Sequence, residues 1–158
     1  DKTRSFMEWR LLDKLSSNNF HVPRPAAARY QQSGTFYTAD IITVRIPGVV
    51  ALSEFIADND PDESFWQSVG AAIYKFHAAG VYHADMNAHN LQIDESGTLW
   101  MLDFDKGALR PRGPWQQATL ARLHRSLRKI INQDPKLNFR APDWEQLLQG
   151  YFNASRST

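Results

Sequence analysis

The chain has 158 residues, a formal net charge of +1, a hydrophobic content of 42% and an aromatic content of 12%. These values predict one globular unit with a buried core and exclude an intrinsically disordered chain. The sequence contains no cysteine, which excludes disulfides and cysteine-based zinc sites. It also lacks an apolar run long enough to span a membrane.

The first part of the chain combines a helix pattern with a hairpin pattern. Apolar residues at helical spacing predict a helix over 5–15, and Ser5 with Glu8 fits a capping box at its start. We then predict two strands, over 26–30 and 35–46, which are joined by a polar turn over 31–34. A hinge is predicted at Pro47-Gly48, directly after the second strand.

The rest of the chain is predicted to be mostly helical. Asp60 and Pro61 offer a cap and a first-turn proline for a helix that carries an apolar stripe from Phe65 to Phe76, and Gly80 ends it. The other predicted helices are a short one over 52–57, an amphipathic one with apolar residues from Leu120 to Ile131, and a last one over 143–152. We expect the polar tail 153–158 to fray.

Three polar residues mark the centre of the sequence. Asp85 and Asn90 lie five residues apart in a polar loop, and Asp103 follows Asp85 by eighteen residues. Between them, two short apolar runs flank the turn 94–97, which is typical of a β-hairpin. Because a hairpin brings its two ends together, we expect these three side chains to converge. Two carboxylates and an amide oxygen at one place suit Mg²⁺, which prefers hard oxygen ligands.

A basic segment follows this loop pair. From Lys106 to Lys129 the chain has seven lysine or arginine residues and no aspartate or glutamate. A local positive field of this kind favours anionic partners, such as phosphates, acidic sugars or an anionic membrane surface. A solvated helix face remains the other interpretation of its helical part.

The loop residues resemble those of a known fold. His83, Asp85 and Asn90, followed by Asp103-Phe104-Asp105, resemble the catalytic and metal-binding loops of the protein-kinase-like fold. With their neighbours, they are most similar to the lipopolysaccharide kinases that phosphorylate 3-deoxy-D-manno-octulosonic acid (Kdo). The resemblance implies an α+β, protein-kinase-like fold that consists mostly of the helical C-terminal lobe. We expect a partial N-terminal lobe over 1–46 and the C-terminal lobe over 47–158.

The N-terminal lobe is expected to be truncated, because neither a Gly-rich loop nor a strand lysine precedes Glu8 in this sequence. The resemblance implies that Asp85 accepts the proton of the attacking hydroxyl, while Asn90 and Asp103 bind Mg²⁺ beside the phosphates of ATP. His83 is expected to hold its loop through hydrogen bonds. The implied cofactor-binding residues are Glu8, which would pair with a strand lysine, and Val44 and Ile46, which would offer backbone groups to adenine.

The acceptor side is less closely specified by the motif. Asn87 and His89 are candidates for contacts with the sugar or its phosphate. Arg110 and Arg112 lie closest in sequence to Asp103 among the arginines of the basic segment, so we predict that they bind the Kdo carboxylate or a lipid A phosphate.

The predicted function is ATP- and Mg²⁺-dependent phosphorylation of a Kdo hydroxyl on the lipid A inner core. The expected partners are Kdo-lipid A and an anionic membrane surface, without nucleic acid, at the cytoplasmic side of the inner membrane. Two alternatives remain at this point: a soluble small-molecule phosphotransferase of the same fold, or a catalytically dead nucleotide-binding fragment.

Overall fold

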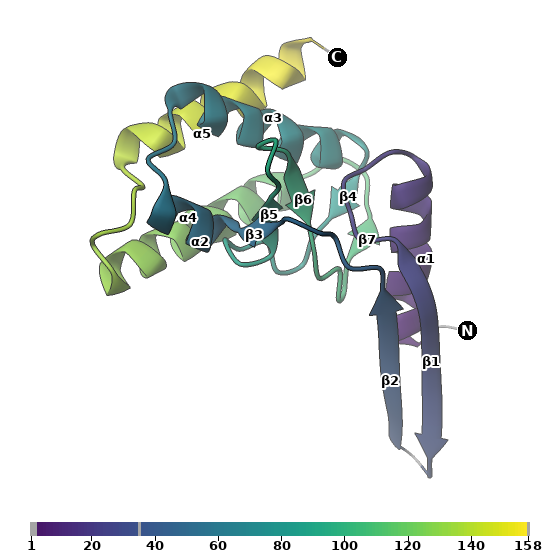
Figure 1. The fold of residues 1–158 in the computed structure, drawn as a ribbon. Coiled ribbons are helices and arrows are strands. Elements are labelled where there is room, and N and C mark those ends of the chain that lie inside the picture. Colours follow the sequence, from purple (N-terminus) through teal and green to yellow (C-terminus); the bar gives the residue numbers. More distant parts are fainter. Residues whose placement is uncertain (1–2, 35, 158) are drawn as a thin grey trace.

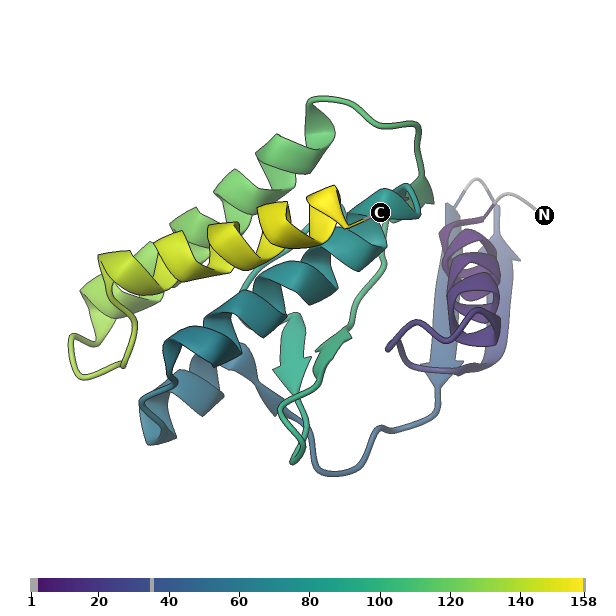
Figure 2. The ribbon, with the colours of Figure 1, turned by 90° about the horizontal axis from the view of Figure 1, so that it is seen from above.

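The structure, a computed structural model, describes residues 3–34 and 36–157. Its N-terminal part consists of helix α1 (Arg4–Ser17) packed along an antiparallel hairpin of β1 (Pro25–Ser33) and β2 (Phe36–Thr43). The hairpin projects from the helical body, to which it is joined by an extended connection (Figure 1, Figure 2). The apolar side of α1 contributes Leu11, Leu12 and Leu15 to the main hydrophobic core. This helix therefore anchors the projecting hairpin to the body.

The start of α1 differs from the prediction. The helix begins at Arg4, so Ser5 lies inside it and is buried. Its hydroxyl donates a hydrogen bond to the carbonyl oxygen of Arg29 on β1, at 3.2 Å. The predicted capping box of Ser5 and Glu8 is therefore wrong, because packing against the hairpin engages the serine instead. Glu8 consequently has no capping role.

The hairpin is also longer on one side than expected. Residues 31–33, predicted as a turn, continue β1, and Gly34 follows with a φ of +62°, a value that glycine tolerates well. The predicted second strand is too long, since β2 ends at Thr43. Its predicted first residue, Thr35, lies outside the described residues.

The helical body is built from four helices and several short strands. The helices are α2 (Leu52–Asp58), α3 (Glu63–Ala78), α4 (Trp115–Gln133) and α5 (Ala141–Arg156). The strands are β3 (Val50–Ala51), β4 (Val81–Tyr82), β5 (Leu91–Ile93), β6 (Leu99–Met101) and β7 (Ala108–Leu109). Strands β3, β5 and β6 form one antiparallel sheet in that order, and β4 pairs with β7. The predicted α+β class is confirmed.

Helix α3 begins two residues later than predicted, at Glu63 instead of Pro61. Its N-cap is Asp62, which accepts a hydrogen bond from the backbone N–H of Phe65 at 2.9 Å. Pro61 therefore precedes the cap rather than occupying the first helical position, and Asp60 forms an ion pair with Arg140 instead. The predicted end is confirmed, because Gly80 has a φ of +75° directly after the helix.

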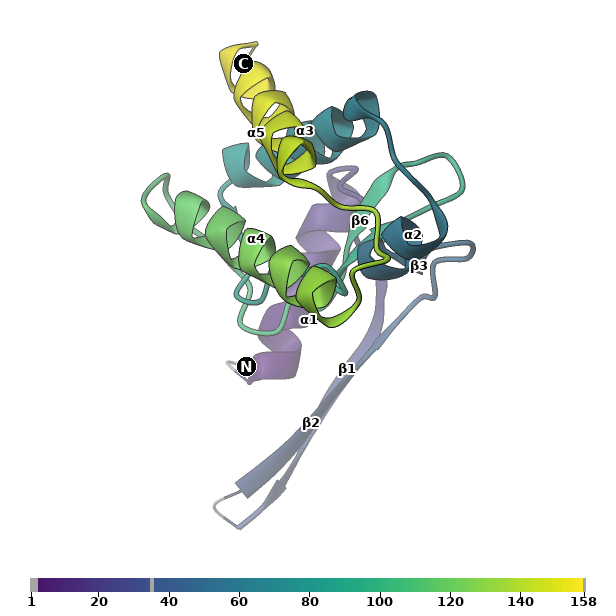
Figure 3. The same ribbon diagram turned by 90° about the vertical axis from the view of Figure 1, so that its left-hand side faces the viewer.

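Helices α3 and α5 lie side by side in unusually close contact (Figure 2, Figure 3). A Cβ atom on Gly70 of α3 would lie 1.9 Å from the carbonyl oxygen of Leu147. A Cβ atom on Gly150 of α5 would lie 2.0 Å from the carbonyl oxygen of Gln67. Both distances are far below van der Waals contact, so the two backbones meet through reciprocal glycines.

Two further predictions, one for the C-terminal tail and one for the loop after Asp105, need correction. Helix α5 continues to Arg156, so most of the tail that was expected to fray is helical; Thr158 lies outside the described residues. The basic loop after Asp105 contains β7, which was not predicted. A two-residue strand carries too little periodicity to be recognised without its partner.

The hairpin of β5 and β6 has the predicted position, with Leu91 opposite Met101 in the register. Its turn is held by Asp94, which accepts hydrogen bonds from the backbone N–H groups of Ser96 and Thr98 and from the indole of Trp100. The Ser96 hydroxyl also donates to Asp94, at 2.6 Å, and this bond, followed by those from Trp100 and the two backbone groups, lowers the pKa of Asp94 to about 2. Just outside the two strands, the N–H of Leu102 donates a hydrogen bond of 2.9 Å to the carbonyl oxygen of Asn90. This hydrogen bond joins the two loops of the candidate site.

Candidate active site

His83 connects the loop of Asp85 to the segment that carries Asp103. The imidazole is fully buried; its Nε2 donates to the carbonyl oxygen of Leu102 at 2.8 Å, and its Nδ1 accepts from the backbone N–H of Asp85 at 3.2 Å. Burial lowers the pKa of His83, so the neutral ring with its proton on Nε2 fits both bonds. The predicted structural role of His83 is therefore confirmed.

Asn90 contacts the backbone of Asp85 and of Leu102, the residue directly before Asp103. Its side-chain amide donates to the backbone carbonyl oxygen of Asp85 at 2.9 Å, while its own backbone carbonyl accepts from Leu102. Among the described residues no donor contacts the side-chain Oδ1 of Asn90, and an amide oxygen in this position suits a hard cation.

Asn87 is used within the loop rather than displayed to solvent. Its amide nitrogen donates to the Asp85 carboxylate at 3.1 Å, and its amide oxygen accepts from the backbone N–H groups of His89 and Asn90 at 2.9 and 3.0 Å. Asn87 therefore orients Asp85. The His89 ring shares a hydrogen bond of 2.9 Å with the hydroxyl of Ser53, in the first turn of α2.

Asp103 has an unusual backbone conformation for a residue with a side chain. Its φ is +61°, in the left-handed region, where a non-glycine residue carries strain of about 1–2 kcal/mol. The following Phe104 is fully buried and packs on the His83 ring, with 4.9 Å between ring centroids. This packing holds Asp103 in its strained position at the exposed surface.

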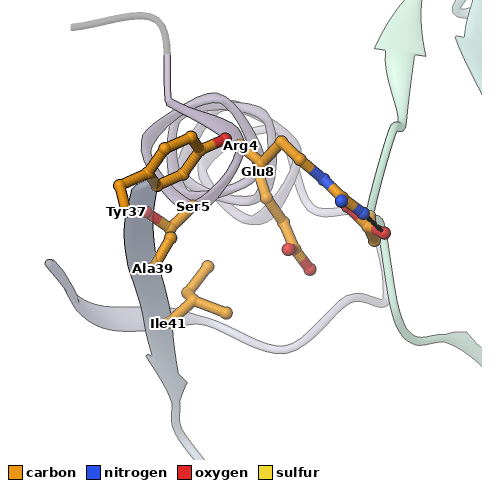
Figure 4. Close-up of a pocket in the computed structure, with 7 residues that line it drawn as sticks. Arg4, Ser5, Glu8, Tyr37, Ala39 and Ile41 are labelled. Atoms are coloured by element: carbon orange, nitrogen blue, oxygen red, sulfur yellow. Dashed lines mark hydrogen bonds and ion pairs between the residues drawn. The ribbon is translucent and has the colours of Figure 1, made fainter. Parts of the chain in front are cut away.

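Glu8 lies on α1, near the segment that carries Asp103 and Asp105. It lines a cavity of about 440 Å³ together with Arg4, Ser5, Tyr37, Ala39, Ile41 and Asp105. Figure 4 shows the Glu8 side chain extending from α1 into the space beside Ile41 of β2. Burial, and then the nearby Asp103 and Asp105 carboxylates, raise the pKa of Glu8. The cavity therefore has an excess of negative charge that a cation would relieve.

One of these carboxylates, that of Asp105, is already paired with a positively charged side chain. Arg4, whose side chain Figure 4 shows, forms a two-pronged ion pair with Asp105, another residue that lines the cavity. Across residues 3–34 and 36–157, no group of three or more histidine, aspartate or glutamate side chains is arranged to hold a metal ion. A metal held by Asn90 and Asp103 would therefore need further ligands, such as phosphate oxygens.

Val44 and Ile46 lie outside this cavity. Both follow β2 and line a separate pocket of about 400 Å³ with Phe20, Trp100 and the end of α1. The N–H of Val44 donates to the carbonyl oxygen of Arg24 at 2.8 Å, so this donor is already engaged. The structure thus does not bring Val44 and Ile46 together with Glu8.

Arg110 and Arg112 are not brought together with Asp85. The guanidinium of Arg110 lies over the Tyr82 ring, 3.5 Å from its centroid, and Arg112 donates to the Tyr74 hydroxyl at 3.0 Å. The reason is the pairing of β7 with β4, which runs antiparallel and carries the chain back toward Gly80, away from the loop of Asp85.

Other cations of the basic segment take this place. A pocket of about 360 Å³ is lined by Asp85, Asn87 and His89 on one side and by Arg122, Arg125, Ser126, Lys129, Ile130 and Gln133 of α4 on the other. Arg122 forms an ion pair with Asp85 at 3.3 Å. These helix residues belonged to the predicted basic segment, but nothing in their sequence distance from Asp103 favoured them.

Comparison with known proteins identifies relatives along nearly the whole chain. The model of the lipopolysaccharide kinase (Kdo/WaaP) family matches residues 1–151. A 3-deoxy-D-manno-octulosonic acid kinase from Xylella fastidiosa (strain 9a5c) is 41% identical over 151 residues, which are 95% of this chain and 60% of that protein. Kinases of the same name from Xanthomonas campestris pv. campestris (strain B100) and Vibrio parahaemolyticus serotype O3:K6 (strain RIMD 2210633) are each 40% identical, over 151 and 131 residues.

The chain spans about 55–60% of the length of these curated relatives. The match nevertheless includes the hairpin, both loops, α4 and most of α5. The resemblance inferred from His83, Asp85, Asn90 and Asp103 is confirmed, and the chain belongs to the lipopolysaccharide kinase (Kdo/WaaP) family.

Proposed function

We propose that this chain carries the catalytic loops of an ATP-dependent kinase that phosphorylates a Kdo hydroxyl on the lipid A inner core of lipopolysaccharide. The observation that carries the proposal is the fixed arrangement of Asp85, Asn90 and the Asp103 segment, joined through His83 and Leu102. The similarity to relatives that are named 3-deoxy-D-manno-octulosonic acid kinase supports the proposal.

In this proposal Asp85 is the catalytic residue. The acceptor hydroxyl attacks the γ-phosphorus of ATP, the bond from that phosphorus to the bridging oxygen breaks, ADP leaves, and the hydroxyl proton passes to Asp85. The hydrogen bond from Asn87 aims the carboxylate, which counts for more than its proton affinity because a carboxylate is a weak base.

The donor set near Asp85 fits Mg²⁺, because the Asn90 amide oxygen and the Asp103 carboxylate are hard oxygen donors on adjoining loops. When bound, Mg²⁺ would neutralise charge that develops on the phosphates during transfer. Glu8 would bind a cation near those phosphates, which agrees with the raised pKa of its carboxyl group. For Val44 and Ile46, the adenine-binding role stays a prediction, to which Val44 would contribute its carbonyl group and Ile46 its backbone groups.

We further propose that the chain is divided into two lobes, a partial N-terminal lobe over 1–46 and a C-terminal lobe over 47–158. In the described part of the chain, no helix is both long and apolar enough to cross a bilayer. We propose that the protein works peripherally at the cytoplasmic side of the inner membrane, where its lipid-linked acceptor would lie. The basic lining of the pocket beside Asp85 supports an anionic acceptor over the cationic substrates of soluble phosphotransferases.

The test uses the complete reading frame that contains residues 1–158, incubated with labelled Mg-ATP and a Kdo-bearing lipid A precursor. We expect labelled lipid to form, and Asp85→Asn to slow its formation by roughly 10²- to 10⁴-fold, the usual contribution of a proton-accepting side chain. The exposed Asp58 supplies the matched control, since Asp58→Asn leaves the loops intact. Absence of labelled lipid with the unmodified protein would contradict the proposed function.

A further inference from the structure

The pocket between the catalytic loop and α4 has a built-in charge pattern that the proposed reaction does not yet use. Arg122, Arg125 and Lys129 project from one side of α4 into it, at helical spacing, and its only carboxylate is that of Asp85. Within the described part of the chain, neither Arg125 nor Lys129 has an ion-pair partner. The pocket therefore carries uncompensated positive charge.

The position of this charge relative to Asp85 is set by a specific contact. Ser126, between the basic residues on the same helix, accepts a hydrogen bond from the backbone N–H of Ala88 at 3.1 Å. Ala88 is fully buried in the loop that carries Asp85. The helix is thus held against the catalytic loop, and its cations lie a fixed distance from the catalytic carboxylate. The volume of about 360 Å³ is sufficient for a small ligand such as a sugar.

Both oxygens of the Asp85 carboxylate are occupied in this structure. Oδ1 contacts the guanidinium of Arg122 at 3.3 Å, and Oδ2 accepts from Asn87 at 3.1 Å. A hydroxyl that approaches Oδ1 from the pocket, on the side of α4, meets the guanidinium of Arg122 there and must displace it. The Arg122 contact is the weaker one to break, because both of its side chains are about half exposed, and exposed ion pairs contribute little.

We propose that the pocket is the binding site for the anionic group of the acceptor, and that this group releases Asp85 by taking Arg122 away from it. A carboxylate or phosphate on the acceptor binds Arg122 with two parallel hydrogen bonds, and Arg125 and Lys129 add to the attraction. Asp85 Oδ1 is then free to accept the acceptor hydroxyl. The anion thereby strengthens acceptor binding and exposes Oδ1 of Asp85 toward the pocket. This inference rests on the proposed kinase function and assigns its acceptor site to α4 rather than to Arg110 and Arg112.

The first test compares acceptors with and without each negative charge. The complete protein is assayed with the Kdo-bearing lipid A precursor, with its Kdo carboxylate methyl ester, and with the dephosphorylated lipid. If the sugar carboxylate is the ligand, the methyl ester raises KM by roughly 10- to 100-fold, and if the lipid phosphate is, the dephosphorylated lipid does so. In Arg122→Gln most of this discrimination is lost, because only the attraction of Arg125 and Lys129 then favours the charged acceptor. A variant that keeps the full discrimination would overturn the proposal.

The second test separates release of Asp85 from simple loss of binding. Without acceptor, Arg122→Gln leaves Asp85 free to orient water, whose oxygen attacks the γ-phosphorus while ADP leaves and the proton passes to Asp85. We expect ATP hydrolysis without acceptor to rise several-fold, although phosphorylation of lipid at low acceptor concentration falls. A merely structural role would lower both rates, and that outcome would overturn the release step. Arg128→Gln is the matched control, since Arg128 faces a different pocket on the same helix.

Binding of free Kdo distinguishes a failure of this inference from a failure of the proposed function. Calorimetry with Kdo and the complete protein should show binding that Arg122→Gln weakens by roughly 10-fold or more and that Arg128→Gln leaves unchanged. If the protein binds Kdo in this pattern but transfers no phosphate, the proposed reaction fails and the anion site stands. If it transfers phosphate but Arg122→Gln binds Kdo normally and keeps the discrimination between charged and neutral lipid acceptors, the site is wrong and the reaction stands.

Discussion

At the level of single residues, the candidate site depends on a buried imidazole that joins two loops. His83 receives one hydrogen bond from the backbone of Asp85 and donates another to the carbonyl oxygen of Leu102, directly before Asp103. Its ring also supports Phe104, which keeps Asp103 in a left-handed backbone conformation. The base and the candidate metal ligand are therefore positioned by the same side chain.

Replacement of His83 by alanine should accordingly affect folding as well as transfer. The change removes two hydrogen bonds, leaves the Leu102 carbonyl oxygen without its donor and opens a cavity beside Phe104. We expect the free energy of unfolding to fall by about 2–4 kcal/mol, measured by urea denaturation. The exposed His21 is the matched control, and His21→Ala should change stability by less than about 0.5 kcal/mol. Equal effects of the two changes would remove His83 from its bridging role.

At the level of elements, the helical body is organised by the contact between α3 and α5. Gly70 and Gly150 allow the two backbones to approach so closely that any side chain at either position meets a carbonyl oxygen. Neither glycine is needed for a special backbone angle, since only Gly34, Gly48, Gly80 and Gly97 among the described glycines have positive φ. The two helices thus depend on the absence of a Cβ atom, which cannot be inferred from helical periodicity.

Gly150→Ala tests this contact. Alanine favours a helix by about 1 kcal/mol over glycine, so without the contact the change would stabilise α5. With a Cβ atom 2.0 Å from the Gln67 carbonyl oxygen, the helices must separate, and we expect a net loss of about 2 kcal/mol or more in thermal or urea unfolding. The neighbouring exposed Gln149 gives the control, because Gln149→Ala changes α5 without touching α3. Stabilisation by Gly150→Ala would refute the close packing.

At the level of the whole molecule, three helices converge on one buried titratable group. His77 of α3 shares hydrogen bonds with the Tyr151 hydroxyl of α5 at 2.9 Å and the Thr119 hydroxyl of α4 at 3.1 Å. Burial lowers the pKa of His77 from 6.5 to about 4. The folded protein therefore holds this ring neutral at pH values at which the unfolded chain binds a proton.

The stability of the protein should depend on pH accordingly. Because the folded pKa of His77 is depressed, its effect is absent above about pH 6.5, and stability falls progressively between pH 6.5 and pH 4, by about 3 kcal/mol in all. His77→Gln removes this part of the slope, while the lowered pKa values of His83 and His124 leave a remainder. Urea unfolding at several pH values measures the difference. An unchanged slope in His77→Gln would show that His77 is not the titrating group.

The local patterns of the sequence were sufficient for much of this architecture. The spacing of Asp85, Asn90 and Asp103 around a hairpin identified the two loops, and Gly80 marked the end of α3 correctly. Such features depend on residues close together in the chain, where turn geometry and periodicity act directly. The misplaced caps at Ser5 and Asp60 have another cause, since contacts with β1 and Arg140 compete with local capping.

By itself, the sequence determined the family, the loop chemistry and the presence of a basic segment after Asp103. Only the tertiary structure decided which of these cations reach the catalytic loop. Sequence distance favoured Arg110, but β7 returns along β4 and carries it onto Tyr82, whereas Ser126 holds α4 against Ala88 and brings Arg122 to Asp85. Neighbours in a folded site are set by strand pairing and helix docking between distant segments, and no local pattern in the chain encodes those contacts.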